Sequence, residues 1–229
     1  MTFLEKIQLK ETDFIVPEEF KEESLEYKKI MATYYAAIKM INTKLGIISD
    51  QLQVEGKRNP IEFVKARLKQ PESIMNKLVR FGLENTLQSL VKIPDIAGVR
   101  IVVTYIDDLY EVANMLAKQD DIKLLKIKNY VKNPKDNGYR SLHLLVEVPV
   151  FFADEKKHVQ VEVQVRTLAM DLWATLEHDI EYKNNLDFQI LKEELKQCAD
   201  IIFDVEERMQ NIKTKMTEMS DKDVQTPNN

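Results

Sequence analysis

His158-Val-Gln-Val-Glu-Val-Gln-Val-Arg166 alternates apolar and polar residues without a break. Because successive side chains of a β-strand point to opposite faces, this segment predicts a strand whose valines share a buried face. Gln160, Glu162, Gln164 and Arg166 then form a row of polar side chains on the other face. Two interpretations of this row stay open: a half-exposed edge strand with solvated side chains, or a site in which a rigidly held carboxylate does chemistry.

The composition is typical of a soluble, helix-rich globular protein. The chain has 229 residues, of which 44% are hydrophobic and 31% charged, with only 5 glycines and 7 prolines. A net charge of −5 argues against bulk binding of nucleic acid or an anionic membrane, so an anionic ligand needs a local basic patch. The single cysteine, Cys198, excludes an intramolecular disulfide. No targeting segment or long apolar run is found, so we expect a cytoplasmic protein.

The N-terminal extension, residues 1–56, is predicted to be helical from Pro17 onward. Positions spaced alternately by four and three run from Phe20 to Leu52 and are apolar except for Ser24. This spacing produces a narrow apolar seam along one side of a helix. The seam either packs on the central domain or carries a subunit interface.

The C-terminal helix, residues 186–220, repeats this pattern from Leu191 to Met219. Its seam has the same two interpretations, and the length of both seams favours an oligomer. The polar tail, residues 221–229, is expected to fray.

The central zone, residues 57–185, alternates strands with helices. Asn59-Pro-Ile-Glu62 carries the signals of a helix start, and a second short helix is expected over 71–82. The remaining elements expected in chain order are a strand over 99–106, a helix to about 118, strands over 122–130 and 141–151, the valine strand, and a helix over 167–183. The fold class is therefore α/β (α+β), with a mixed sheet flanked by helices and long terminal helices.

A basic patch lies early in the central zone. Its members are Lys65, Arg67, Lys69, Lys77 and Arg80, with Glu72 as the one acid among them. On the second short helix, Ser73, Lys77 and Arg80 recur at i, i+4 and i+7 and so share a face. Clustered donors and positive charge favour phosphate binding, and the alternative is a solvated face.

Two carboxylates are candidates for chemistry on phosphates. Asp95 precedes the strand expected over 99–106, and Glu162 lies on the valine strand. Gly98 has no Cβ and allows another group to approach the backbone. Two acids from different strands are suited to holding Mg²⁺, because magnesium takes one or two protein carboxylates and leaves the other positions to water and phosphates. One of them is also a candidate general base toward a hydroxyl.

A turn followed by a strand carries a second candidate group. Tyr139 follows Gly138 in a loop that contains Lys135, and it either stacks on a nucleobase or packs in the core. On the helix over 167–183, Asp171 and His178 are expected to face a cleft, where His178 either contacts the substrate or has a structural role. Leu168, Leu172, Leu176 and Ile180 are expected to form a buried stripe. His178-Asp179 does not predict a metal hydrolase, because the other two histidines lack ligand spacing to it.

Four motifs in order resemble the synthetase domain of the RelA/SpoT proteins. They are Asp95-Ile-Ala-Gly-Val-Arg100, Gly138-Tyr-Arg-Ser-Leu-His143, Glu162-Val-Gln-Val-Arg-Thr167 and Trp173-Ala-Thr-Leu-Glu-His178. The chain length and flanking helices are similar to those of the stand-alone small alarmone synthetases. The wording of the motifs is closer to the RelP (YwaC) type than to the RelQ type.

The resemblance implies a nucleotidyltransferase-like fold and a pyrophosphokinase activity. Such enzymes transfer the β,γ-diphosphate of ATP to the 3′-hydroxyl of GDP or GTP, giving AMP and ppGpp or pppGpp. The chain has no room for the hydrolase domain of long family members, so synthesis without hydrolysis is expected. The resemblance also implies a homo-oligomer, a tetramer, formed through the terminal helices.

The resemblance assigns roles to individual positions. The implied ATP-binding residues are Arg67, Lys69, Ser73, Lys77, Arg80 and Arg100. The implied residues of the guanine nucleotide site are Lys135, Tyr139, His143, Gln164 and Asp171. Asp95 and Glu162 are implied as the catalytic residues and the ligands of Mg²⁺. Arg67 and Arg100 are expected to sandwich adenine, Tyr139 to stack on guanine, and Asp171 to replace the asparagine of RelQ-type members.

Two other functions stay open from the sequence. One is a catalytically silent nucleotide-binding scaffold, and the other is a nucleotidyltransferase that moves a nucleotide rather than a diphosphate. The motifs do not distinguish GDP from GTP as acceptor.

Overall fold

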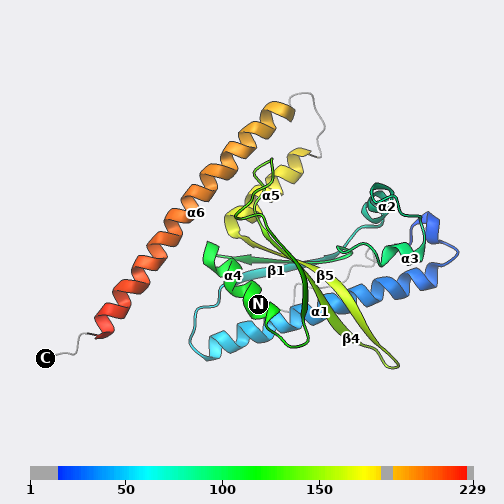
Figure 1. Cartoon of the computed structure of the whole chain (residues 1–229), viewed down its shortest axis with the longest axis horizontal. Coiled ribbons are helices and arrows are strands. Elements are labelled where there is room, and N and C mark those ends of the chain that lie inside the picture. The colour runs from blue at the N-terminus through cyan, green and yellow to red at the C-terminus, as the bar shows by residue number, and fades with distance from the viewer. Residues whose placement is uncertain (1–14, 182–187, 226–229) are drawn as a thin grey trace.

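The computed structural model describes residues 15–181 and 188–225 (Figure 1). They form a twisted sheet, and one long helix precedes its strands in the sequence while another follows them. The helices are η3 (Glu18–Phe20), α1 (Ser24–Val54), α2 (Pro71–Arg80), α3 (Leu87–Leu90), α4 (Ile106–Ala117), α5 (Leu168–Glu181) and α6 (Phe188–Gln225). The strands are β1 (Ile61–Leu68), β2 (Ala97–Val103), β3 (Lys123–Asn129), β4 (Leu142–Phe151) and β5 (Lys156–Thr167).

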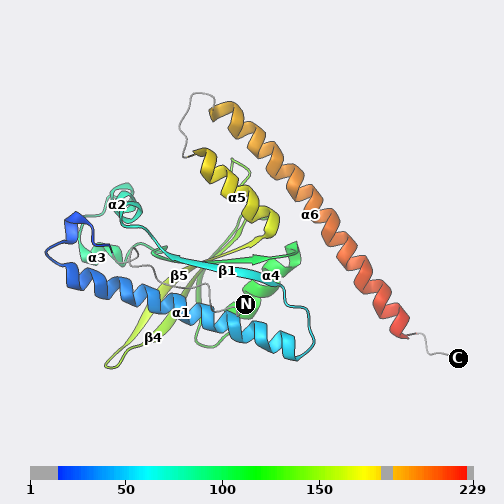
Figure 2. The same ribbon diagram turned by 180° about the vertical axis from the view of Figure 1, so that it is seen from behind.

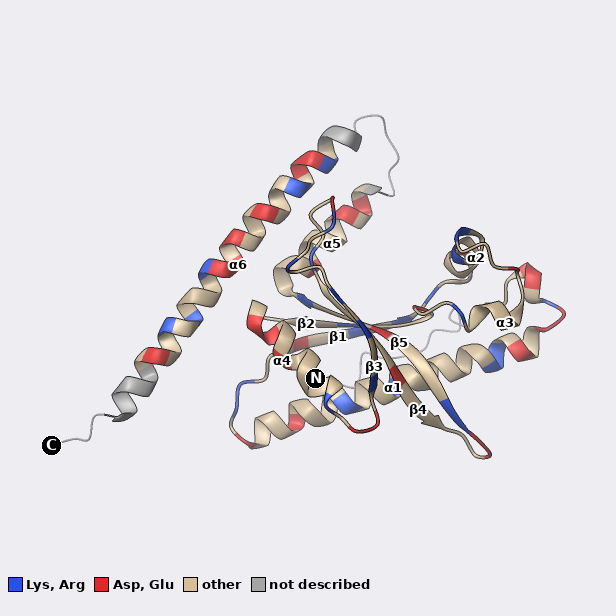
Figure 3. Cartoon of the chain, viewed as in Figure 1, with Lys and Arg blue, Asp and Glu red and all other residues tan. Residues whose placement is uncertain are grey.

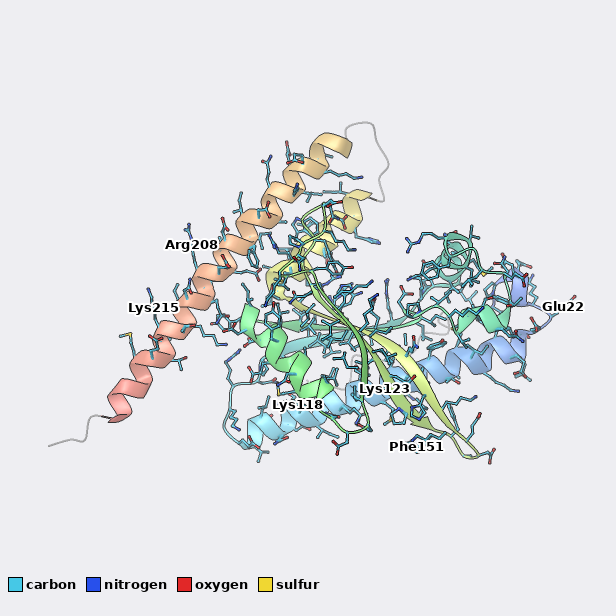
Figure 4. All side chains as sticks on the ribbon, in the orientation of Figure 1. Glu22, Lys118, Lys123, Phe151, Arg208 and Lys215 are labelled. Carbon is cyan, nitrogen blue, oxygen red and sulfur yellow. The ribbon has the colours of Figure 1, made fainter. Side chains whose placement is uncertain are left out.

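The sheet has five strands in the order β1-β2-β5-β4-β3. β2 and β5 are parallel, and the other neighbouring pairs are antiparallel, so the predicted mixed sheet is confirmed. β5 is the central strand, which makes the interpretation as an edge strand wrong. The β4–β5 hairpin projects beyond the rest of the sheet, and Phe151 lies near its tip (Figure 4).

The valine face of β5 is buried as predicted. Val161, Val163 and Val165 are fully enclosed, and they belong to the same core as α1 and α4. The α1 seam from Tyr27 to Leu45 is buried in that core, so the N-terminal seam packs on the central domain. Burying each of these large side chains stabilises the fold by about 1.5–3 kcal/mol. The opposite, polar face of the sheet is left for ligands.

The predicted helix start at Asn59 is wrong, because residues 61–68 form strand β1. The Asn59 side chain accepts a hydrogen bond from the Ile61 N–H (3.0 Å) and donates to Ser49 (2.6 Å), which is turn geometry and not a helix cap. β1 then pairs with β2 along its length. From Val64 to Leu68 its apolar and polar residues alternate, and tertiary pairing outweighs the local capping signal. Lys65 and Arg67 therefore lie on a strand.

The leucine stripe of α5 is exposed, contrary to expectation. Leu168, Leu172 and Leu176 are between 45% and 58% exposed. The helix instead buries the face that carries Met170 and Trp173. The Trp173 indole donates a 2.7 Å hydrogen bond to the Leu195 carbonyl, which ties α5 to α6.

The C-terminal helix α6 leaves the body of the protein as it proceeds (Figures 1 and 2). Its first half packs on α5 through Leu195, Ala199 and Ile202. From Val205 to Met219 the apolar seam is exposed, and charged residues are distributed along the helix (Figure 3). The helix extends to Gln225, so it includes part of the tail that was expected to fray. Within the described ranges no helix is long and apolar enough to cross a membrane.

Candidate active site

The polar face of the sheet carries a first cavity of about 260 Å³, where β1, β2 and β5 are neighbours. Its walls are formed by Lys65, Ala66, Arg67, Asp95, Gly98, Val99, Arg100, Glu162 and Gln164. Strand register places Arg67 opposite Gly98, and Gly98 opposite Glu162. The structure therefore brings both predicted acids, both arginines predicted to bind adenine, and Gln164 to one place.

Asp95 is held by two lysines. Its Oδ2 atom lies 2.6 Å from the Lys77 ammonium and 3.1 Å from the Lys69 ammonium. Its Oδ1 atom is buried and has no hydrogen-bond partner. A buried carboxylate oxygen without a partner is costly, and it fits the position of a ligand to a hard cation.

The donor set around the first cavity fits magnesium better than a closed protein metal site. Asp95 and Glu162 line the same cavity, and the described residues contain no cluster of three or more His, Cys, Asp or Glu side chains suited to a metal. Mg²⁺ normally keeps several waters or phosphate oxygens beside one or two carboxylates. The two acids therefore suffice for a magnesium ion that arrives with a polyphosphate.

Each oxygen of the Glu162 carboxylate faces a nitrogen of a neighbouring side chain. Gln164 Nε2 donates to Oε2 at 2.8 Å, and His143 Nδ1 lies 3.5 Å from Oε1. Burial by itself raises the pKa of Glu162, but the hydrogen bonds from His143 and Gln164, with the charges of His143 and Lys77, bring the pKa down to about 2. Glu162 is thus a fixed anion at neutral pH.

The three polar residues predicted on one face of α2 differ in what they contact. Ile74 and Leu78 are buried, which orients the helix as expected. Lys77 reaches Asp95, whereas Ser73 and Arg80 are exposed and do not line the first cavity. Those two side chains are placed to meet only a ligand that extends out of the cavity toward α2.

A second cavity of about 450 Å³ adjoins the first. It is lined by Lys128, Tyr130, Lys135, Asn137, Tyr139, His143, Glu162, Gln164 and Glu177. Glu162 and Gln164 line both cavities. Two ligands, one in each cavity, would therefore meet at the Glu162 carboxylate.

Tyr139 is the central aromatic residue of the second cavity. Its ring is 8% exposed and lies edge-on to Tyr130 at 6.0 Å between centroids. The Lys135 ammonium lies 4.7 Å from the ring centroid, and Lys135 itself is exposed. A base that stacks on Tyr139 must displace this ammonium, which is free to move because its side chain is in solvent.

The comparisons with known proteins assign the chain to a family. A family model described as "Region found in RelA / SpoT proteins" matches residues 66–187. The chain is 44% identical over 190 residues to GTP pyrophosphokinase YwaC of Bacillus subtilis (strain 168), a match that covers 82% of this chain and 90% of that protein. The chain belongs to the RelA/SpoT family.

The chain is also similar to other RelA/SpoT proteins. It is 33% identical over 194 residues to GTP pyrophosphokinase YjbM of the same organism, covering 84% of this chain and 91% of that one. The crystal structure of the small alarmone synthetase 1 from B. subtilis, bound to its product pppGpp, matches with a TM-score of 0.77 at 33% identity, covering 84% and 99%. The predicted fold class and the closer likeness to YwaC are confirmed.

Asp171 of this RelA/SpoT chain contacts two basic residues that line the first cavity. Its Oδ1 atom accepts hydrogen bonds from Arg100 (3.0 Å) and Arg166 (3.2 Å), and its Oδ2 atom faces Lys65 at 3.9 Å. Burial lowers the pKa of Arg100, as do the charges of Arg166 and Arg67, while Asp171 opposes them. Asp171 lines neither cavity in this state, so its contact with guanine stays a prediction.

The sequence reasoning missed several residues of this RelA/SpoT site. Lys128, Tyr130, Asn137 and Glu177 line the second cavity, and Asn137 donates to Glu177 at 2.9 Å. Asn137 sits one residue before Gly138, and its turn propensity alone suggested a loop residue. Glu177 precedes His178, which is exposed and lines neither cavity.

Proposed function

We propose that this protein is a (p)ppGpp synthetase that transfers the β,γ-diphosphate of ATP to the 3′-hydroxyl of GDP or GTP, without hydrolase activity. The observation that supports it most directly is that two cavities share the Glu162 carboxylate. A transfer between two nucleotides requires such adjoining sites, because the reacting oxygen and phosphorus must meet in a fixed geometry. The names of YwaC and YjbM as GTP pyrophosphokinases support the same reaction.

The first cavity is proposed to hold ATP. Arg67 and Arg100 line it from neighbouring strands and would enclose adenine between planar guanidinium groups. Lys69 and Lys77 already meet an anion, Asp95, and would turn toward the phosphates. The exposed Ser73 and Arg80 of α2 would meet the distal phosphates.

The second cavity is proposed to hold GDP or GTP. Tyr139 would stack on guanine after Lys135 moves away, with Lys135 and His143 near the sugar and phosphates. Gln164 would support the acceptor at the boundary between the cavities. Asp171 is proposed to keep guanine selectivity, because a carboxylate accepts from both N1–H and the 2-amino group.

Asp95 and Glu162 would hold Mg²⁺ together with the ATP phosphates. The ion supplies charge neutralisation on the diphosphate, which is the main requirement of phosphoryl chemistry. Asp95 contributes its unpartnered Oδ1 to this role.

Glu162 is also proposed to orient the acceptor. In the reaction the 3′-oxygen bonds to the β-phosphorus of ATP, the bond from that phosphorus to the α,β-bridging oxygen breaks, and AMP leaves. The 3′-hydroxyl donates its hydrogen bond to Glu162, which is ionised. A carboxylate with so low a pKa is a weak base, so it takes the proton of the 3′-hydroxyl late in the reaction. Late proton transfer suits a loose transition state, because such a state needs little activation of the nucleophile.

Product identification tests the proposal. Incubation with ATP, Mg²⁺ and GDP is expected to yield AMP and a guanosine carrying four phosphates. Released pyrophosphate would instead indicate a nucleotidyltransferase, and bound nucleotides without turnover would indicate a scaffold. Glu162→Gln is the matched control, since it keeps shape and fold but removes the anion, and we expect it to abolish product. Incubation with ppGpp and a divalent metal is expected to leave ppGpp intact.

An oligomer is proposed on the exposed seam of α6. The apolar residues from Val205 to Met219 are 43–67% exposed, and helices with such seams associate with another helix. We propose a homotetramer formed through the terminal helices, in which α6 supplies the apolar seam because the seam of α1 is buried in the core. As an enzyme that uses ATP and guanine nucleotides, the protein is proposed to act in the cytoplasm.

A further inference from the structure

Arg166 is an enclosed cation that touches neither cavity. It is 5% exposed, and its neighbour Gln164, two positions earlier on β5, lines both cavities. Burying a guanidinium is unfavourable unless its contacts compensate. Arg166 donates to Asp171 through Nη1 (3.2 Å), and through Nη2 to the Tyr139 hydroxyl (2.7 Å) and the Gln164 carbonyl (2.9 Å). Its Nη2 group therefore begins two separate hydrogen-bond chains.

The first chain passes through Gln164. Arginine has no acceptor, so the atom of Gln164 facing it must be the carbonyl oxygen. The amide nitrogen of Gln164 then points the other way and donates to Glu162 Oε2 at 2.8 Å. Arg166 thus decides which end of the amide faces the carboxylate.

The second chain passes through Tyr139 and His143. The Tyr139 oxygen accepts from Arg166 and lies 2.9 Å from His143 Nε2. When His143 is neutral and Nε2 carries no proton, the Tyr139 hydroxyl donates to it. A neutral imidazole that accepts at Nε2 carries its proton on Nδ1. That Nδ1 faces Glu162 Oε1 at 3.5 Å. The first chain therefore ends in a hydrogen bond to Glu162 Oε2, and the second ends in a longer contact at Oε1. With His143 in the neutral Nδ1–H form, both chains present a donor to the carboxylate.

We propose that Arg166 is a positioning residue for the reaction, which orients Gln164 and selects the Nδ1–H tautomer of His143 so that both oxygens of Glu162 face donors. The inference rests on the proposed function for its catalytic meaning. The donors on Gln164 and His143 fix the orientation of the Glu162 carboxylate plane. They therefore determine which way its remaining lone pairs point in the first cavity. Partners that orient a ligand or catalytic group in this way typically contribute 10–100-fold to activity.

The tautomer of His143 tests the proposal in the protein without nucleotides. The chain has 3 histidines, so ¹⁵N-histidine labelling gives few signals, and His143→Gln assigns the one that matters. At about pH 9, where an imidazole is neutral, the Nδ1–H form is expected. Arg166→Met removes the donors at similar length, and we expect the Nε2–H form to appear and kcat to fall about 10–100-fold. The KM for ATP should change less than threefold.

Two controls distinguish a positioning role of Arg166 from the simpler role of neutralising the buried Asp171 carboxylate. Arg58→Met removes the arginine paired with buried Asp108, away from both cavities, and should leave the His143 signal unchanged. Arg166→Met with Asp171→Asn removes both buried charges, and should recover thermal stability but not the tautomer. An unchanged His143 tautomer in Arg166→Met overturns the proposal. A wild-type protein that makes no ppGpp overturns the proposed function instead, and the tautomer still reports on Arg166.

Discussion

Gly138 lies so close to Ala199 that a methyl group added to it would come within 2.8 Å of the Ala199 Cβ. The contact joins the loop before Tyr139 to the first half of α6. Gly138 also has a φ of 88°, which only glycine adopts without strain. The long C-terminal helix is thus packed directly against the loop that carries the proposed guanine platform.

Gly138→Ala is therefore expected to destabilise the protein and raise the KM for the guanine nucleotide. Gly56→Ala is the matched control, since Gly56 has a φ of 65° but nothing within 4 Å of an added Cβ. The control should lose about 1–2 kcal/mol from backbone strain. Gly138→Ala should lose roughly 1–3 kcal/mol more from overpacking, measured by urea unfolding. Equal losses of unfolding free energy in the two variants would mean that α6 shifts away from residue 138 and relieves the contact with Ala199.

Asp95→Asn is expected to abolish the magnesium dependence of ATP binding. The substitution removes the charge that offers Oδ1 to a cation, and it also releases Lys69 and Lys77 toward phosphate. Turnover should fall by at least about 100-fold, as for loss of a group that stabilises transition-state charge. Calorimetric titration with ATP, with and without Mg²⁺, measures the effect. Binding that still strengthens with Mg²⁺ would assign the ion to other ligands.

Tyr139→Ala is expected to weaken the guanine nucleotide more than ATP. Loss of base stacking costs about 1–3 kcal/mol, or roughly 5–150-fold in affinity. Tyr139→Phe keeps the ring and its packing against Trp173, so guanine binding should be largely retained. Equilibrium binding of both nucleotides gives the comparison, and equal losses for ATP and GDP would argue against stacking.

Glu206→Gln is expected to stabilise the protein at neutral pH. Burial raises the pKa of Glu206, while a hydrogen bond from Thr167 and the charge of Arg140 partly oppose it. The folded protein therefore binds this proton more tightly than the unfolded chain does. Its favourable contribution is present below the unfolded pKa of 4.5 and is lost as pH rises through the folded value.

Thermal unfolding at two pH values measures this effect. At pH 7 the Tm of Glu206→Gln should exceed that of the wild type by roughly 2–4 °C, which corresponds to about 1 kcal/mol in a chain of this size. At about pH 4 the difference should vanish, because the carboxyl is then protonated in both states. Glu207→Gln, at an exposed position on the same helix, should change neither value.

Val205→Asp is expected to lower the number of subunits in the assembly. Val205 is 43% exposed on the α6 seam, so the aspartate would be buried only when a second copy covers it. Asn211→Asp adds the same charge off the seam of α6 and should leave the assembly unchanged. Arg208 and Lys215, labelled in Figure 4, mark the charged surface of this helix. Light scattering reports the mass, and an intact assembly of Val205→Asp would exclude this seam as the interface.

The sequence by itself determined the elements that have a strong hydrophobic periodicity. It also identified the acidic and basic side chains that are suited to binding metal and phosphate. The valines of β5 and the apolar seam of α1 have periods that match only one kind of element, so their buried faces followed directly. Asp95 and Glu162 were recognisable as acids beside a basic patch, and the four family motifs identified the region around them.

Only the tertiary structure decided how these parts meet. β1 became a strand because pairing with β2 outweighs the capping signal at Asn59, and α5 turned its leucines outward because Trp173 packs toward α6. That Glu162 borders two cavities, and that Arg166 reaches it through two chains, depends on contacts between residues far apart in sequence. Periodicity says which face a side chain is on, but the distances and hydrogen-bond directions on that face come from strand order and helix docking.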